Sequence, residues 1–233
     1  MSARVGLLVP SSNVTMEIEL PPLLRQQLPE ADVPSFHAAR MRMTAVTPTA
    51  LAAMDAQAER CAAELADAQV DVLAYACLVA VMVQGPGSHR AAERRLTDPA
   101  GGAPVISSAG ALVSVLHDLG AERVAMITPY APALTTTVID YLAAEEVEVV
   151  DAISLGVTDN AAVGRLDPRQ LIAIADRLDT SRAQAVVASA CVQLPSLSAL
   201  AEIERRTGLP TVSAASATAR AVSRHLQLAS TTV

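Results

Sequence analysis

The chain has 233 residues, of which 52% are hydrophobic and 18% charged, and its formal net charge is −7. An acidic chain with 2% aromatic residues and no Trp lacks the basic patches and stacking rings used to bind nucleic acids. Its apolar residues occur in short runs, none close to the ~20 residues of a membrane span, and residues 1–4 lead straight into a strand-like run without a signal peptide. We therefore expect a cytoplasmic protein with no nucleic-acid or membrane partner.

The first part of the chain alternates between strand and helix patterns. Short runs of small and β-branched residues predict strands at residues 4–9, 35–41, 71–76 and 104–107. Helical patterns follow from residue 15, from 47 to about 68, near 90–96, and from 108 to Gly120. Thr47 and Pro48 are typical of a helix N-cap and first turn, whereas Pro21 and Pro22 are expected to interrupt or kink the first helix.

The order of these patterns then begins again. The strand at residues 123–128 resembles 4–9, the helix start at Asp167 resembles Thr47, and strands 184–190 and 210–213 resemble 71–76 and 104–107. Four similarities in the same order indicate a two-fold duplication. The sequence predicts an α/β fold of two pseudo-symmetric, doubly wound domains with parallel sheets and a site in the cleft between them. The first domain is assigned to residues 1–108 plus 214–233 and the second to 109–213, with the boundary uncertain by one strand-helix unit.

Two of the three cysteines occupy equivalent positions in this duplication. Cys77 and Cys191 each follow a buried strand, whereas Cys61 falls on the apolar stripe of a helix and is expected to be a core residue. Ligands of open α/β sheets bind at the carboxyl ends of the strands. A single cysteine at such a position is more often a core residue, but core packing gives no reason to place one at both equivalent ends. The pair therefore indicates a site with two thiols.

The other loops at these strand ends carry neutral, hydrogen-bonding side chains: Asn13, Tyr130 and, in the loop before the Asp167 helix, Asn160. Such groups, together with backbone N–H groups, can hold a small anion without Arg, Lys or His. Each also has a simpler explanation. Asn13 can cap the helix that starts near residue 15, Tyr130 can be a loop residue, and Asn160 can be a turn residue.

Other chemistries lack their motifs. No GxGxxG or Walker A sequence follows the first strand, and no HExxH motif or zinc-type cysteine spacing occurs. The four histidines lie far apart in the sequence, and no Ser, His and Asp arrangement is recognisable.

Four segments resemble the maleate cis-trans isomerases, which belong to the aspartate/glutamate racemase superfamily and are related to arylmalonate decarboxylases. They begin at Pro10, Tyr75, Thr128 and Ser189 and read PSSNVTME, YACLVA, TPY and SACVQLPSL. Amino-acid racemases usually have Asn-Thr after each cysteine, and the decarboxylases keep the second cysteine alone. This chain has Leu-Val and Val-Gln after its two cysteines, which favours an isomerase.

The resemblance implies cofactor-independent conversion of maleate to fumarate through a succinyl-cysteine-type intermediate, usually in a homodimer. It implies that Cys77 is the nucleophile and Cys191 the acid/base. Asn13, Tyr130 and Asn160 would hold the substrate carboxylates, helped by backbone N–H groups around Val79 and Val192. No cofactor or metal is implied. With no nearby His, Cys77 would need backbone dipoles to lower its pKa.

Two alternatives remain open. One is a racemase or decarboxylase of the same superfamily that acts on a small dicarboxylate. The other is a non-catalytic small-anion binding protein, which leaves the paired thiols unexplained.

Overall fold

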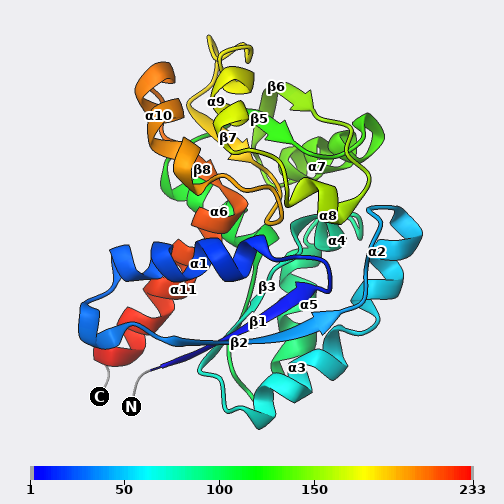
Figure 1. The fold of residues 1–233 in the computed structure, drawn as a ribbon, viewed down its shortest axis with the longest axis vertical. Helices are drawn as coiled ribbons and strands as arrows, with labels where there is room; N and C mark the ends of the chain where they lie inside the picture. Colours follow the sequence, from blue (N-terminus) through cyan, green and yellow to red (C-terminus); the bar gives the residue numbers. More distant parts are fainter. Residues whose placement is uncertain (1–2, 232–233) are drawn as a thin grey trace.

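The computed structural model describes residues 3–231, so the first two and last two residues of the predicted domains lie outside the described part. Eight parallel strands form two four-stranded sheets, with orders β2-β1-β3-β4 and β6-β5-β7-β8. The strands are β1 (Arg4–Pro10), β2 (Ser35–Met41), β3 (Val72–Tyr75), β4 (Val105–Ser107), β5 (Arg123–Thr128), β6 (Glu148–Ser154), β7 (Ala185–Ser189) and β8 (Thr211–Ser213). The two sheets lie in separate lobes, the first below the second in Figure 1.

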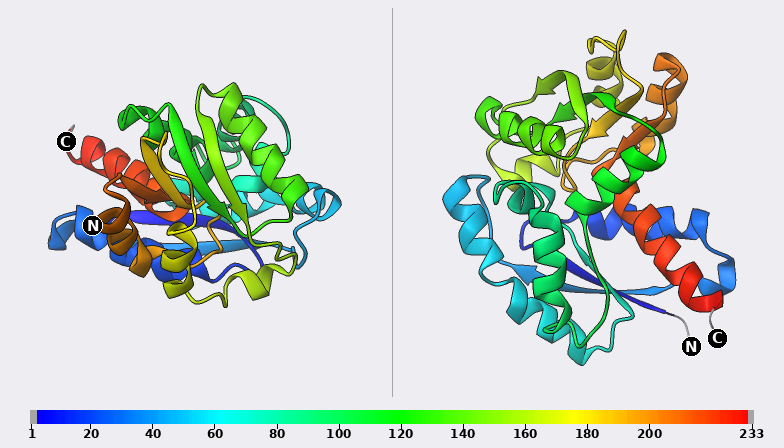
Figure 2. Two further views of the ribbon diagram at one scale, coloured as in Figure 1. Left: turned by 90° about the horizontal axis from the view of Figure 1, so that it is seen from above. Right: turned by 180° about the vertical axis from the view of Figure 1, so that it is seen from behind.

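Helices cover both lobes and fill the space between them (Figures 1 and 2). The α-helices are α1 (Thr15–Gln27), α2 (Pro48–Asp55), α3 (Ala58–Asp67), α4 (Leu78–Met82), α5 (Ser88–Thr97), α6 (Ser108–Asp118), α7 (Pro132–Ala144), α8 (Asn160–Val163), α9 (Arg169–Ala175), α10 (Leu197–Thr207) and α11 (Ala214–Thr231), and η1 (Glu30–Asp32) is a short 3₁₀ helix. Within residues 3–231, no helix is both long and apolar enough to cross a membrane.

The predicted fold class is confirmed, and the two sheets repeat the same strand order. In each, the first strand of the half lies at the centre and pairs with the second and third strands, while the fourth adds outside the third. The strands β3 and β7 are fully buried. This burial explains their continuous runs of Val, Leu and Ala, since a strand covered on both faces has no polar side.

The C-terminal helix α11 returns to the first half of the chain. It packs against α1, β3 and β4 of that half as well as against α6, and its buried Thr218 hydroxyl donates to Ser108 Oγ at 2.9 Å. In the view from behind in Figure 2, α11 runs across the lower lobe. This path supports a first domain that includes residues 214–233, although the boundary itself stays a prediction.

Three local expectations differ from the structure. The first helix is not interrupted: Pro21 and Pro22 lie inside α1, and both are partly exposed. The helix expected at residues 47–68 is two helices, α2 and α3, separated at Gln57. The Gln57 amide bonds the backbone of Arg42, with Oε1 accepting from its N–H at 3.0 Å, which ties this break to the end of β2. Asn160 lies at the start of the short helix α8 and not in a loop.

Candidate active site

Cys77 and Cys191 lie at equivalent ends of the two sheets. Cys77 follows β3 and precedes α4, and Cys191 follows β7. Their exposed fractions are 4% and 6%, and both line one cavity between the lobes. Twelve residues from both halves surround this cavity, and none carries a formal charge: Pro10, Asn13, Met43, Val46, Cys77, Leu78, Val79, Tyr130, Asn160, Cys191, Val192 and Gln193. All seven residues predicted for the site are therefore brought together.

Asn13 is held by both halves of the chain. Its N–H donates to Pro10 O at 2.8 Å in the turn that leaves β1. The side-chain Oδ1 accepts from Met16 N–H at 3.1 Å, so the expected capping role is real. The Nδ2 lies 3.5 Å from Val192 O of the second half, where it faces the cavity. Capping orients the amide and leaves its N–H₂ group available to a ligand.

Asn160 approaches the cavity from the opposite lobe. Asp159 caps α8, with its carboxylate accepting from Ala161 N–H at 2.8 Å, and this fixes where Asn160 begins the helix. The Asn160 Nδ2 donates to Ser12 Oγ at 2.8 Å, and Ser12 Oγ donates in turn to Met43 O at 2.7 Å. One of the two amide hydrogens is used in this way, and the other can serve a bound anion.

Tyr130 is 2% exposed and follows β5. Its hydroxyl donates to Ala190 O at 3.2 Å and lies in hydrogen-bonding contact with the sulfur of Cys191. Burial, followed by the neighbouring Cys191, raises the pKa of this phenol well above its usual value. Tyr130 therefore stays a neutral hydrogen-bond donor at physiological pH.

The backbone around Val79 differs from the backbone around Val192. Val79 lies in the first turn of α4, where helical N–H groups have no partner within the helix. The next N–H, that of Ala80, bonds to the sulfur of Cys77. The Val192 carbonyl group accepts from Asn13 Nδ2 at 3.5 Å. The Val79 side of the cavity thus presents the N-terminus of α4.

Burial dominates the electrostatics of Cys77. Desolvation raises the pKa of its thiol to about 12; the N–H of Ala80 opposes this rise, while Cys191 and Asp55 add to it. The Ala80 N–H thus supplies a backbone dipole that lowers the pKa of Cys77, but desolvation outweighs it. In the closed cavity the Cys77 thiol is neutral at pH 7.

Cys191 is better supplied with hydrogen-bond donors. Burial again raises the pKa of its thiol, but three groups oppose the rise: the Tyr130 hydroxyl and the N–H groups of Gln193 and Leu194. The Gln193 N–H lies 3.4 Å from the sulfur. A negative charge that formed on Cys191 would therefore meet two N–H donors already in place, and the Tyr130 hydroxyl once its proton turns from Ala190 O.

The cavity is closed by two loops, one from each lobe. The volume open to the centre of a water molecule is about 10 Å³, which is the space of one water. Met43 and Val46 of the loop between β2 and α2 line it. Backbone contacts join this loop to the one before α8: Val46 N–H to Thr158 O at 3.0 Å, Asn160 N–H to Thr44 O at 3.3 Å, and a β-bridge between Ala45 and Asp159. These contacts hold the two loops together beside the cavity.

Two further polar groups adjoin the site without having been predicted for it. Gln193 lines the cavity and is 2% exposed. Tyr75, two residues before Cys77, donates its buried hydroxyl to Asp55 Oδ1 at 2.5 Å, and Arg95 pairs with the same carboxylate at 2.9 Å. The sequence places Gln193 in the loop that follows the second strand-end cysteine, whereas it offered no signal for Tyr75, whose partners Asp55 and Arg95 lie on other segments. Among residues 3–231, no group of three or more His, Cys, Asp or Glu side chains is arranged to hold a metal ion.

Comparison with known proteins identifies the family of this chain. The profile of the arylmalonate decarboxylase family matches residues 5–232. A maleate isomerase of Geobacillus stearothermophilus is 50% identical over 231 residues, covering 97% of this chain and 92% of that protein.

Two solved structures are similar to this fold throughout. A variant of the maleate isomerase Iso from Pseudomonas putida S16, crystallised with maleate, has a TM-score of 0.92 and 46% identity, covering 95% of this chain and 91% of that chain. A cysteine-to-serine mutant of the Nocardia farcinica maleate cis-trans isomerase, with a covalently bound succinylcysteine intermediate, has a TM-score of 0.93 and 48% identity, covering 97% and 94%. The chain belongs to the arylmalonate decarboxylase family and, within it, to the maleate isomerases.

Proposed function

We propose that this protein converts maleate to fumarate without a cofactor, with Cys77 as the nucleophile and Cys191 as the acid/base. The observation that supports this most directly is the pair of thiols, one from each sheet, in a single uncharged cavity with two asparagines and a tyrosine. The Nocardia farcinica enzyme forms a succinylcysteine, which is the adduct that addition of a thiol to maleate produces.

Rotation about the C=C bond of maleate requires that this bond become single. The Cys77 thiolate adds to C2, and the electron pair of the double bond takes a proton from the Cys191 thiol at C3. The resulting succinyl adduct rotates about its C2–C3 bond. The Cys191 thiolate then removes a proton from C3, the double bond re-forms, and Cys77 leaves as a thiolate. Atoms and charge balance, since fumarate departs and both thiols return to their starting states.

In this scheme the two thiols share one negative charge. The charge starts on Cys77, lies on Cys191 in the adduct, and then returns. The mutual effect of the two sulfurs fits this sharing, because Cys191 raises the pKa of Cys77 and so opposes a second thiolate. The N–H groups of Gln193 and Leu194 stabilise the charge while the adduct persists.

The substrate carboxylates are assigned to the groups on either side of the thiols. Asn13 and Asn160, with the N–H groups near Val79 and Val192, hold the two carboxylates, and Tyr130 donates to the one that gains enediolate character. These groups are all neutral, so they stabilise charge as it develops without binding the dianion too tightly to release it.

A turnover assay tests the proposal. Purified protein incubated with maleate should produce fumarate, followed by the vinyl proton signals of the two isomers. Release of CO₂ from an arylmalonate, or exchange of the α-hydrogen of an amino acid, without any fumarate would favour a decarboxylase or racemase instead. Binding of maleate without turnover would favour the anion-binding protein.

The tyrosine hydroxyl can be tested by Tyr130→Phe. We expect kcat to fall by about 10²–10³, the usual effect of one lost oxyanion donor. The same change leaves the Ala190 carbonyl group without this donor, so the free energy of unfolding should decrease by only about 1 kcal/mol. Steady-state kinetics and thermal melting separate the two effects. A wild-type kcat would exclude a catalytic role for the hydroxyl.

The raised thiol pKa predicts a pH dependence. Because the pKa of Cys77 is about 12 in the free protein, the thiolate fraction should grow by about tenfold per pH unit below that value. We therefore expect kcat/KM to increase steadily between pH 7 and pH 9, while Cys191, whose pKa is also raised, stays protonated as the acid. A flat kcat/KM profile over this range would contradict a neutral Cys77 in the free enzyme.

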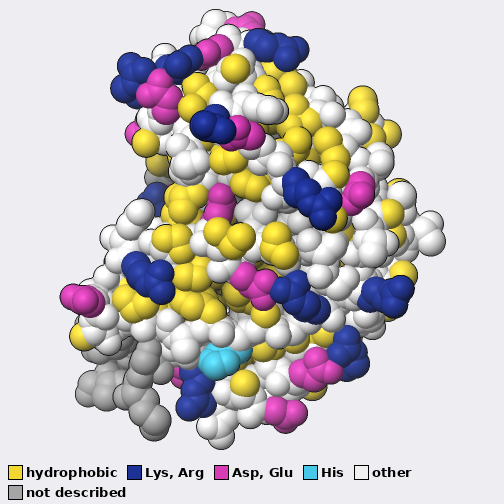
Figure 3. Space-filling view, in the orientation of Figure 1, with side chains coloured by type: hydrophobic (Ala, Val, Ile, Leu, Met, Phe, Trp, Pro, Cys, Tyr) yellow, Lys and Arg dark blue, Asp and Glu magenta, His cyan; other side chains and the backbone are white. Residues whose placement is uncertain are grey.

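We also propose a cytoplasmic homodimer. Val14 and Ile18 of the α1 region are 47% and 67% exposed, and apolar side chains gather over this part of the front face (Figure 3). Exposed apolar patches of this kind mark protein contacts. Three free cysteines fit a reducing compartment. Light scattering should give twice the 24.1 kDa of one chain; a mass of 24.1 kDa would reject the dimer.

A further inference from the structure

The side chain of Gln193 uses every hydrogen-bonding position of its amide. Oε1 accepts from Val14 N–H at 3.2 Å and from Thr15 N–H at 3.5 Å. Nε2 donates to Ser12 O at 2.9 Å and to Asn160 O at 3.0 Å. Two donors face the oxygen and two acceptors face the nitrogen, so the orientation of the amide is fixed by its surroundings.

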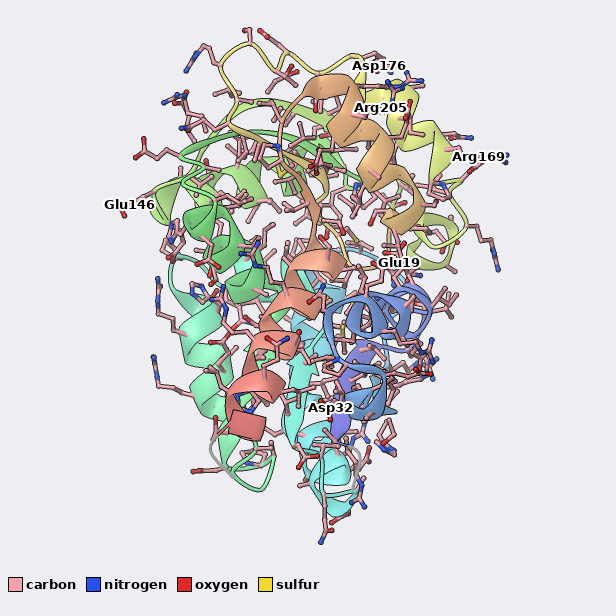
Figure 4. All side chains as sticks on the ribbon, turned by 90° about the vertical axis from the view of Figure 1, so that its left-hand side faces the viewer. Glu19, Asp32, Glu146, Arg169, Asp176 and Arg205 are labelled. Atoms are coloured by element: carbon pink, nitrogen blue, oxygen red, sulfur yellow. The ribbon has the colours of Figure 1, made fainter. Side chains whose placement is uncertain are left out.

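Three of these bonds join Gln193 of the second half to the segment around Asn13 in the first half, and the fourth joins it to Asn160 within its own half. Ser12 and Thr15 flank Asn13, whereas Asn160 belongs to the other lobe. The same contact continues along α1, where the buried Glu19 carboxylate accepts from Ser196 N–H at 2.6 Å and Leu197 N–H at 2.8 Å. In Figure 4, Glu19 lies where α1 meets the upper lobe. Within this contact between the lobes, the Gln193 amide bonds both to Ser12, next to Asn13, and to Asn160 itself.

Gly164, the residue that ends α8, provides independent support. Its backbone angles, φ −67° and ψ −9°, are open to any residue, so its conformation does not require glycine. A Cβ atom at this position would lie 2.5 Å from Gln193 Nε2 and 3.1 Å from its Cδ. Moving the end of a long side chain is ordinarily easy, but here it would break the bonds of Nε2 to Ser12 and Asn160. The glycine therefore leaves the space that the amide occupies.

We propose that Gln193 is a positioning residue for the substrate: its amide sets the separation between Asn13 and Asn160, and Gly164 keeps the space that this requires. The inference rests on the proposed function, in which these asparagines bind the two carboxylates of maleate. A dicarboxylate held from two lobes depends on their spacing, and a neutral amide fixes that spacing without adding charge beside a dianion.

A double-mutant cycle with Gly164→Ala and Gln193→Ala tests this. Each single variant should raise the KM for maleate by about tenfold or more, with a much smaller change in kcat, because ground-state and transition-state carboxylate binding weaken together. In the double variant, the methyl group added at position 164 occupies the space that the Gln193 amide has vacated. The double variant should therefore have the same KM as Gln193→Ala alone.

Gln184→Ala is the matched control. Its side-chain oxygen also accepts a backbone N–H, that of Arg123 at 3.0 Å, but Gln184 does not line the cavity. We expect this variant to lower Tm and leave KM unchanged. Fluorescence melting in the absence of maleate checks that each variant is folded. If Gln193→Ala does not fold, the KM of Gly164→Ala alone tests the inference.

The outcomes separate this inference from the function on which it rests. Wild-type protein that produces no fumarate would overturn the proposed function and the inference with it. Wild-type turnover with an unchanged KM in both single variants, or with a lowered Tm and kcat alone, would overturn the positioning role only. Additive effects of the two substitutions on KM would also overturn it, since Gly164 would then act on something other than the amide.

Discussion

Cys77→Ser is expected to reduce conversion of maleate to fumarate by roughly 10⁴-fold or more, as removal of an essential nucleophile does in other enzymes. A serine hydroxyl at this buried position would be far less ionised than the thiol, whose own pKa is already raised by burial. The substitution preserves the shape of the residue, so folding should change little. Steady-state kinetics and thermal melting on the same preparation provide the measurement.

Cys61→Ser is the control for this experiment. Cys61 is fully buried in α3, does not line the cavity, and its Sγ lies 3.5 Å from Arg40 O. A serine there can donate to the same carbonyl group, which limits the cost of burying the hydroxyl. Turnover per folded enzyme should stay near the wild-type value. Substantial turnover in Cys77→Ser, or a selective loss in Cys61→Ser, would show that the nucleophile has been assigned to the wrong thiol.

Cys191→Ser is expected to stop the reaction after addition. The nucleophile remains, and the adduct can take its C3 proton from water, but the group that removes this proton is gone. Intact-protein mass spectrometry after incubation with maleate should show the gain of one maleic acid, and peptide mapping should place it on Cys77. The cysteine-to-serine mutant of the Nocardia farcinica enzyme that holds a succinylcysteine is consistent with this expectation.

Two controls make the labelling specific. Denatured protein should react at every available cysteine without preference, because maleate slowly alkylates exposed thiols. Folded Cys77→Ser protein should carry no adduct. An adduct on Cys191 in that variant, with none on Cys77 in Cys191→Ser, would reverse the roles of the two cysteines.

The sequence by itself was sufficient for the fold class and for predicting which residues share the cavity. Short, fully apolar runs predict buried parallel strands, and the repeated order of strands predicts two similar sheets; both are local signals. Parallel strands end at the same edge of a sheet, so residues that follow the strands, such as Cys77, Cys191 and Tyr130, could be expected to converge. These three residues line the cavity, as do Asn13, Val79, Asn160 and Val192, whose roles were implied by the family resemblance.

The tertiary structure alone decided how those residues are held. The Gln193 amide bonds to Ser12 across 181 positions of sequence, and the break between α2 and α3 is tied to the backbone of Arg42 by Gln57. The raised pKa of Cys77 likewise depends on how completely the two lobes exclude water from the cavity. Hydrogen bonds and desolvation of this kind arise between segments that meet only in the folded chain, so no pattern along a single segment could predict them.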